Sequence, residues 1–191
     1  MVPNIITGSS GFIGSHLYDR LVADDKKVMP VDKDLGREHD LTIESNVKNL
    51  PETSILYHLA AFNGTKHFYD LPTEVLVNNT LPTLYLSARY RDINTKFIFA
   101  STCEIFNGAI ELNSGLVPTD EHVPVAFIDV DNPRWSYSLP KALGENLIAN
   151  AHSRWNSIRF FNIYGPRQKD HFISEFVERA KNGVFEIYGN D

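Results

Sequence analysis

Near its start the chain reads Thr7-Gly8-Ser9-Ser10-Gly11-Phe12-Ile13-Gly14, which places three glycines three residues apart. The apolar run Asn4–Ser9 predicts a strand, and the amphipathic stretch from Gly11 to Asp24 predicts a helix. Glycines permit a tight turn, and the first turn of a helix offers free N–H groups to a pyrophosphate. The spacing is G-x-x-G-x-x-G, which differs from the general G-x-G-x-x-G pattern. We therefore predict a phosphate-binding turn between this strand and this helix.

Short apolar runs and longer amphipathic stretches alternate along the rest of the chain. Strands are predicted over 27–32, 54–61, 96–101, 157–164 and 184–188, helices over 72–90, 133–153 and 171–182, and a polar loop over 107–133. Pro30 inside the second strand favours an irregular or edge position. Strands separated by helices of this length indicate an α/β fold, with a parallel sheet, helices on both faces and ligands at the carboxyl ends of the strands.

The composition is that of a soluble enzyme-sized domain, with 191 residues of which 42% are hydrophobic and 22% charged. The formal net charge of -6 and the scattered basic residues argue against a nucleic-acid partner. The absence of a secretory signal and of a run near the ~20 apolar residues of a membrane span argues against secretion and membrane insertion. A single cysteine excludes an internal disulfide and fits a cytoplasmic location. The seven histidines lack metal-ligand spacing, so no metal site is predicted.

Asp32 stands at the end of the second predicted strand. A carboxylate at this position accepts hydrogen bonds from the adenosine ribose hydroxyls and repels a 2′-phosphate. It favours NAD over NADP as the cofactor, although the neighbouring Lys33 weakens that preference.

Tyr137 and Lys141 lie four residues apart, which places them on one face of a predicted helix. A free tyrosine, with a pKa of about 10, is a poor base at neutral pH. A nearby ammonium would stabilise the phenolate and lower that pKa. Thr102 follows the strand predicted over 96–101 and is a candidate third member of this group. Pro140 lies between the pair, and a kink there would misplace Lys141.

Taken together, these motifs resemble those of the extended short-chain dehydrogenases that modify nucleotide sugars, the NAD-dependent epimerase/dehydratase family. The matching segments follow the family's order and cover almost all of the chain: Thr7–Gly14, Asp32, Asp40-Leu41, His58-Leu59-Ala60-Ala61, Asn79, Phe99–Thr102, Tyr137–Lys141 and Arg159–Pro166. The resemblance implies a Rossmann-like doubly wound parallel sheet that binds NAD, followed by a small substrate lobe.

The resemblance also implies roles for individual residues. Those that would bind the cofactor are Gly8, Gly11, Phe12, Ile13, Gly14, Asp32, Asp40 and Leu41 beside the adenine, Ala60, Ala61, Asn79, Tyr137 and Lys141. Thr102 would hydrogen-bond the reacting hydroxyl, and Asn162 would contact the substrate near its diphosphate. Tyr137 would take the proton from the sugar O4 while hydride passes from C4 to NAD, which produces a 4-keto sugar.

Glu104, two residues after Thr102, bears on which member of the family this is. Sugar 4,6-dehydratases and nucleotide-sugar decarboxylases resemble the chain in having a glutamate there, so Glu104 is a candidate second acid/base residue. Cys103 stands where some dehydratases have an aspartate. Epimerase, dehydratase and UDP-glucuronate decarboxylase all remain open; the last would need an arginine from beyond Asp191.

The chain ends directly after its last predicted strand, so we expect an incomplete substrate lobe. The expected division is a NAD-binding domain over 1–165 and the beginning of the lobe over 166–191. An inactive dinucleotide-binding module is therefore the alternative outside the enzymes. By resemblance alone, we expect a homodimer formed through helices 72–90 and 134–152.

Overall fold

The computed structural model describes residues 2–91, 93–169 and 172–183. The chain forms two compact units, of which the first ends at Phe161 and the second begins at Asn162. The first unit contains the whole sheet, and the second contains α7 (Phe172–Lys181). The strand predicted over 184–188 lies outside the described residues.

In the part of the chain that the structure describes, five parallel strands form one sheet, in the order β2 (Val28–Val31), β1 (Asn4–Thr7), β3 (Ile55–His58), β4 (Lys96–Thr102) and β5 (Trp155–Phe160). From β1 the chain moves outward to β2, and from β3 it moves to the other side through β4 and β5. The direction of winding therefore reverses between β1 and β3. Parallel α/β sheets bind ligands at such a reversal, outside the carboxyl ends of the strands.

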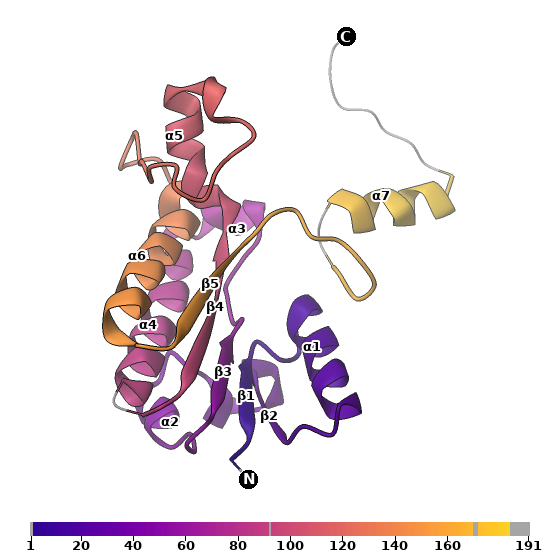
Figure 1. Ribbon diagram of the computed structural model, residues 1–191. Coiled ribbons are helices and arrows are strands. Elements are labelled where there is room, and N and C mark those ends of the chain that lie inside the picture. Colours follow the sequence, from indigo (N-terminus) through magenta and orange to yellow (C-terminus); the bar gives the residue numbers. More distant parts are fainter. Residues whose placement is uncertain (1, 92, 170–171, 184–191) are drawn as a thin grey trace. The chain divides into compact units, whose positions relative to one another are not determined.

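Helices cover both faces of this sheet, as predicted (Figure 1). α1 (Phe12–Ala23) packs against β1 and β2 on one face. α4 (Pro72–Tyr90) and α6 (Trp135–Ala151) pack against each other on the opposite face. The short helix α2 (Glu44–Lys48) lies against α4. The fold is therefore the predicted Rossmann-like α/β class.

Several predicted boundaries were wrong. β5 ends at Phe160, not residue 164, because Phe160 pairs with Thr102, the last residue of β4. α6 begins at Trp135, not Pro133, although the Pro133 carbonyl accepts a hydrogen bond from the Ser136 N–H at 3.0 Å. The segment predicted as a loop over 107–133 opens with α5 (Asn107–Leu112).

Pro30 lies in β2, which pairs only with β1 among the described strands and forms an edge of the sheet. The carbonyls of Lys27, directly before β2, and of Val31 accept hydrogen bonds from the N–H groups of Asn4 and Gly8. The backbone groups of the odd-numbered residues 27, 29 and 31 therefore face β1. By the same alternation Pro30 directs its nitrogen away from β1. The missing N–H therefore costs no hydrogen bond within the sheet, which confirms the edge position predicted for this proline.

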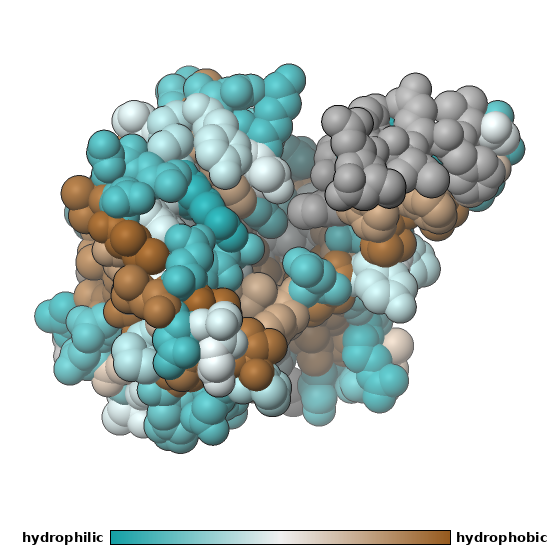
Figure 2. Space-filling model, turned by 90° about the horizontal axis from the view of Figure 1, so that it is seen from above, coloured by the Kyte–Doolittle hydropathy of each residue, from teal (hydrophilic) through white to brown (hydrophobic). Residues whose placement is uncertain are grey.

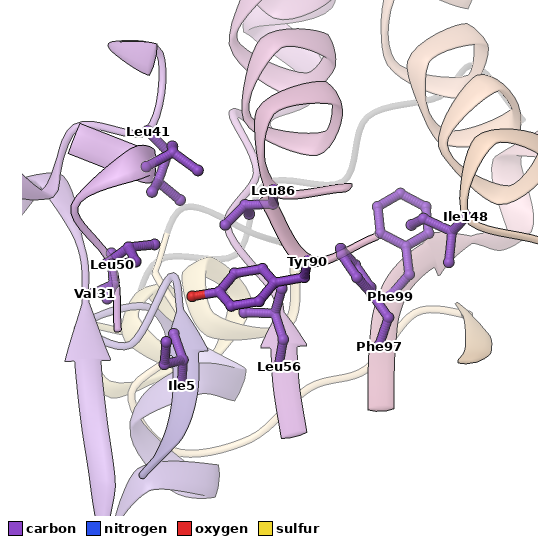
Figure 3. Close-up of a cluster of buried hydrophobic side chains, with 11 residues drawn as sticks. Ile5, Val31, Leu41, Leu50, Leu56, Leu86, Tyr90, Phe97, Phe99 and Ile148 are labelled. Carbon is purple, nitrogen blue, oxygen red and sulfur yellow. The ribbon is translucent and has the colours of Figure 1, made fainter. Parts of the chain in front are cut away.

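The core lies between the sheet and the α2, α4 and α6 face (Figure 3). Phe97 and Phe99 of β4 project from the sheet into it, and Leu86 and Tyr90 of α4 meet them from the helical layer. Tyr90 is fully buried, and its hydroxyl donates to the Pro51 carbonyl at 2.8 Å. This packing fixes α4 against the sheet.

A buried histidine, His58 of β3, joins this strand to β1 and α4. The two ring nitrogens of His58 lie 2.8 Å from Thr7 Oγ1 and 3.0 Å from Thr83 Oγ1. Thr83 Oγ1 donates its hydrogen to the Asn79 carbonyl, so it accepts from His58 Nε2–H, and Nδ1 is the acceptor. Burial, followed by the charge of Lys141, lowers the pKa of His58 to about 3. His58 is therefore neutral in the folded protein.

This burial makes the stability of the fold sensitive to acid. The folded pKa of His58, about 3, lies below the ordinary value of 6.5, so its contribution to stability is complete above pH 6.5 and is lost as the pH falls toward 3. Between pH 7 and pH 4 the free energy of unfolding should fall by about 3 kcal/mol more in the wild type than in His58→Gln, which has no titrating ring. Urea titrations at both pH values measure this difference, and an equal fall in both proteins would contradict the assignment.

Candidate cofactor and catalytic site

The glycine loop between β1 and α1 is closely packed and carries no side-chain cap. Gly8 has a φ of 70°, and its N–H donates to the Val31 carbonyl at 2.9 Å. A Cβ on Gly14 would lie 2.0 Å from the Gly8 carbonyl oxygen, so only glycine fits there. Gly11 is the N-cap of α1 and supplies no side-chain hydrogen bond. The N–H groups of the first turn, Phe12 to Gly14, are therefore free of intrahelical partners and available to an anion.

Asp32 directly follows β2 and ties the loop to it. One carboxylate oxygen accepts from the Ser10 N–H at 2.9 Å, and the other accepts from the Asp34 N–H at 3.1 Å. These two hydrogen bonds hold the carboxylate at the entrance to the adjoining pocket.

A pocket extends from this loop across the ends of β1, β2 and β3. It contains six of the predicted cofactor residues: Gly8, Asp32, Asp40, Leu41, Ala60 and Ala61. It also contains residues that the motifs did not predict: Val31, Lys33, His39, Thr42, Phe62, Asn78 and Pro82. The Nζ atom of Lys33 lies 5.6 Å from the centroid of the Phe62 ring.

Hydrogen bonds to neighbouring residues hold two of the predicted side chains. Asp40 Oδ1 accepts from both the N–H and the hydroxyl of Thr42, at 2.9 and 2.7 Å. Asn79 is buried and is not among the residues that line the pocket. Its side chain donates to the Phe62 carbonyl at 2.9 Å and accepts from the Phe62 N–H at 3.1 Å. Asn79 thus holds the backbone directly after Ala60 and Ala61, whereas its neighbour Asn78 faces the pocket.

The candidate catalytic residues come from β4 and α6. Thr102 is buried at the end of β4, and its Oγ1 accepts from the Glu104 N–H at 3.2 Å. Lys141 is 3% exposed, and its ammonium donates to the Ala100 carbonyl at 2.7 Å. The same nitrogen lies 5.7 Å from the centroid of the Tyr137 ring. α6 continues through Pro140, so the proline does not separate Lys141 from Tyr137.

The ionisation of Tyr137 differs from the prediction. Its pKa is raised to about 12, first by burial and then by the charges of Glu104 and Cys103. Desolvation lowers the pKa of Lys141 to about 8. The expected lowering of the Tyr137 pKa was therefore wrong for the protein without ligand, because burial of the phenol and its acidic neighbours raise this pKa.

No motif in the sequence marks the residue that covers Tyr137. Phe68, in α3 (Thr65–Asp70), stacks on the Tyr137 ring with centroids 5.0 Å apart and planes 15° from parallel. The Phe68 carbonyl also accepts from the Ser136 hydroxyl at 3.5 Å. α3 therefore holds the start of α6 and orients the phenol.

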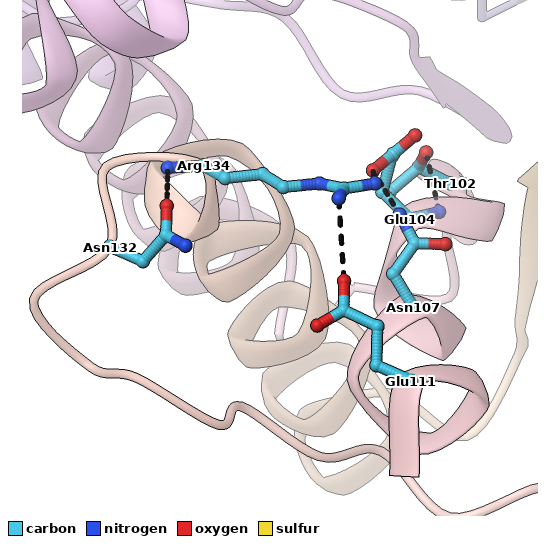
Figure 4. Close-up of polar contacts among 6 residues, drawn as sticks. All are labelled: Thr102, Glu104, Asn107, Glu111, Asn132 and Arg134. Carbon is cyan, nitrogen blue, oxygen red and sulfur yellow. Dashed lines mark hydrogen bonds and ion pairs between the residues drawn. The ribbon is translucent and has the colours of Figure 1, made fainter. Parts of the chain in front are cut away.

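Glu104 lies in a polar network beside Thr102 (Figure 4). The side-chain amide of Asn107 donates to its carboxylate, and Arg134 approaches the same oxygen to 3.6 Å. Arg134 also lies 3.4 Å from Glu111. Burial is the first cause of the raised pKa of the Cys103 thiol, which therefore stays protonated at neutral pH.

The remaining predictions concern the second unit, metals and membranes. Asn162 begins the second unit, which is compact on its own. Within the described ranges, no group of three or more His, Cys, Asp or Glu side chains could hold a metal ion. No helix in these ranges is sufficiently long and apolar to cross a membrane.

Comparisons with known proteins agree with this geometry. The model of the NAD dependent epimerase/dehydratase family matches residues 4–190. The UDP-N-acetyl-alpha-D-glucosaminuronate decarboxylase of Bacillus cytotoxicus is 30% identical over 97% of this chain and 64% of its own length. The UDP-glucuronic acid decarboxylase 4 of Arabidopsis thaliana is 27% identical over 97% of this chain and 45% of its own length.

A solved structure shares the fold over most of the chain. The UDP-glucose 4-epimerase of Thermus thermophilus, in its complex with NAD, is similar with a TM-score of 0.76 at 26% identity. The match covers 95% of this chain and 63% of that one. The chain therefore spans between 45% and 64% of the length of these three relatives.

Proposed function

Because this chain belongs to the NAD-dependent epimerase/dehydratase family, we propose that it binds NAD and acts on a nucleotide sugar by oxidation at C4. One observation carries the proposal. The uncapped glycine loop follows the carboxyl end of β1, and the pocket lies beside Asp32 at the end of β2. Thr102 ends β4, and Tyr137 and Lys141 face this strand from α6.

The residues present fit the cofactor. A Cβ on Gly14 would collide with the Gly8 carbonyl, so the glycine keeps the loop packed on the first turn of α1, whose N–H groups would bind a pyrophosphate. Asp32 would accept from the adenosine ribose, while Asp40 and Leu41 would lie beside the adenine. Asn79 would act indirectly, because its amide positions the backbone at Phe62. When bound, NAD supplies the hydride acceptor.

The chain's own residues would orient the sugar and move its proton. Thr102 would hydrogen-bond the reacting hydroxyl, and Tyr137 would take the proton from O4 as the hydride leaves C4. Lys141 would hold the nicotinamide ribose and face the phenol. The raised pKa of Tyr137 means that ligand binding must favour the phenolate before this step can occur.

Glu104 supports two further candidates, a 4,6-dehydratase and a nucleotide-sugar decarboxylase. Its carboxylate lies beside Thr102 and is partly exposed, which supports a role in exchanging a proton with the sugar. Decarboxylases are among the relatives, which is consistent with the second candidate. Within the second unit, Asn162 and residues 166–191 would begin the substrate lobe.

Identification of the nucleotide released on denaturation tests the proposal first. We expect chromatography of the denatured protein to yield NAD, and we expect Asp32→Ala to retain about tenfold less of it, since a hydrogen-bonded carboxylate contributes this order of affinity. Asp129→Asn, which removes a carboxylate outside the pocket, is the matched control. A protein that neither yields NAD nor binds added NAD would overturn the proposal. NAD binding without turnover of UDP-, GDP- or dTDP-sugars would favour the inactive dinucleotide-binding module.

From the resemblance to the family, we also propose a homodimer formed through α4 and α6. Leu84 of α4 and Leu143 of α6 are exposed and apolar, as an interface requires. Figure 2 shows hydrophobic residues gathered on the side where α6 lies in Figure 1. Light scattering that gives the mass of one chain would contradict the dimer. Cell fractionation would test the cytoplasmic location, which we propose from the single cysteine and the composition.

A further inference from the structure

A guanidinium group stands beside the candidate catalytic residues, and none of the proposed steps uses it. Arg134 is the N-cap of α6, three residues before Tyr137. Its side chain extends toward the end of β4, where the Thr102 hydroxyl and the Glu104 carboxylate lie together (Figure 4). A cation is therefore present where a sugar held by Thr102 and Tyr137 would lie.

The two ion pairs of Arg134 are loose. Its guanidinium nitrogens lie 3.6 Å from Glu104 and 3.4 Å from Glu111, beyond the 2.7–2.9 Å that is usual for charge-assisted hydrogen bonds. The Arg134 and Glu111 side chains are 39% and 49% exposed. Ion pairs this exposed contribute little free energy, so a ligand can replace them at low cost.

Arg159 shows what a structural arginine looks like in the same fold. It lies 2.7 Å from Glu145, and the two side chains are 23% and 15% exposed. It also donates to the Glu121 carbonyl at 2.7 Å. Arg159 thus fastens β5 to α6 and to the segment after α5 with short hydrogen bonds. Arg134 makes no contact this short with Glu104 or Glu111, and its Cζ lies 5.9 Å from the centroid of the neighbouring Trp135 ring, so its guanidinium is held less tightly than that of Arg159.

We propose that Arg134 binds a carboxylate on the substrate sugar and that Glu111 occupies this position until the sugar arrives. The inference rests on the proposed function and names its substrate class, a nucleotide-linked uronic acid. A sugar carboxylate would take the place of the Glu111 carboxylate on the guanidinium and leave Glu104 on the other side. A neutral hydroxymethyl group carries no charge with which to displace Glu111. The arginine that a decarboxylase was expected to need from beyond Asp191 thus has a counterpart inside the chain.

The test compares UDP-glucuronate with UDP-glucose, which differ only in a carboxylate or a hydroxymethyl group at C5. Calorimetry with the NAD-loaded full chain should show about tenfold tighter binding of UDP-glucuronate, the order expected for a charged hydrogen bond. Arg134→Gln should remove this preference and leave the affinity for UDP-glucose unchanged. Glu111→Gln should act in the opposite direction and tighten the binding of UDP-glucuronate several-fold, because it removes the carboxylate that competes for Arg134. Glu52→Gln, at an exposed position before β3 and outside the site, controls for the loss of one negative charge.

Different outcomes overturn the inference and the proposed function. Equal binding of the two sugars, or a preference that survives Arg134→Gln, overturns the role of Arg134 and leaves the proposed function intact. Weaker UDP-glucuronate binding in Glu111→Gln overturns the exchange between Glu111 and the substrate. Failure of both sugars to bind a chain that retains NAD overturns the nucleotide-sugar function and the inference with it.

Discussion

Gly14→Ala is expected to abolish NAD binding, with a loss of affinity of about a hundredfold or more, and to lower the free energy of unfolding by about 3 kcal/mol. The added Cβ would lie 2.0 Å from the Gly8 carbonyl oxygen and 2.9 Å from Ser9 Cα, so backbone must move to admit it. The movement would displace Gly8, whose own Cβ position lies 2.7 Å from the Ala60 nitrogen. One methyl group would thus disturb the loop, the start of α1 and the end of β3 together.

Gly11→Ala is the matched control in the same loop. Its Cβ would lie 3.3 Å from the Gly8 carbonyl oxygen, a contact that a shift of a few tenths of an ångström relieves. Gly11 also has an ordinary φ of -73°. Titration of both variants with NAD, together with urea unfolding, separates the two positions. Retention of wild-type affinity by Gly14→Ala would contradict the packing of the loop.

Tyr137→Phe should reduce NAD reduction by the substrate sugar about a thousandfold, the middle of the range for a general acid–base residue. The phenyl ring retains the stack on Phe68, 5.0 Å between centroids, so the fold and NAD binding should persist. Single-turnover measurements of nicotinamide absorbance, with UDP-glucuronate and UDP-glucose, report the step directly.

Tyr69→Phe supplies the control for this substitution. Tyr69 lies in the same short helix as Phe68, is 55% exposed and lies outside the catalytic group, so its variant should turn over at the wild-type rate. A Tyr137→Phe enzyme with more than a tenth of wild-type turnover would show that another group accepts the proton.

The elements that the sequence predicted well are those whose side chains face the core over several turns or residues. Ile5, Leu56 and Phe97 are fully buried, and their apolar runs predicted β1, β3 and β4. Short helices such as α3 have no such period, and tertiary contacts hold them, as Phe68 does against Tyr137. Propensity alone therefore could not find them.

The same distinction holds in the site. The glycine spacing pointed to the pocket because a tight turn requires glycine. Asp32 pointed to it because a carboxylate at the end of this strand can accept hydrogen bonds from a ribose. His39 and Thr42 also line it, but His39 ends a 3-10 turn and Thr42 lies between that turn and a short helix, with no pattern that marks either residue. The pKa of Tyr137 depends on burial and on Glu104 and Cys103, which only the folded chain brings together with the phenol.

The proline of β2 also bears on solubility. An open sheet edge offers a row of unpaired backbone donors and acceptors, along which a second molecule can add its own strand and begin aggregation. At β2 such a molecule would meet a pyrrolidine ring where it needs a donor, because Pro30 turns its nitrogen outward. β5 contains no proline, so backbone pairing from outside is free to extend the described sheet at that edge. Within the described residues the two edges are therefore unequal, because β2 carries a proline that opposes intermolecular strand addition and β5 does not.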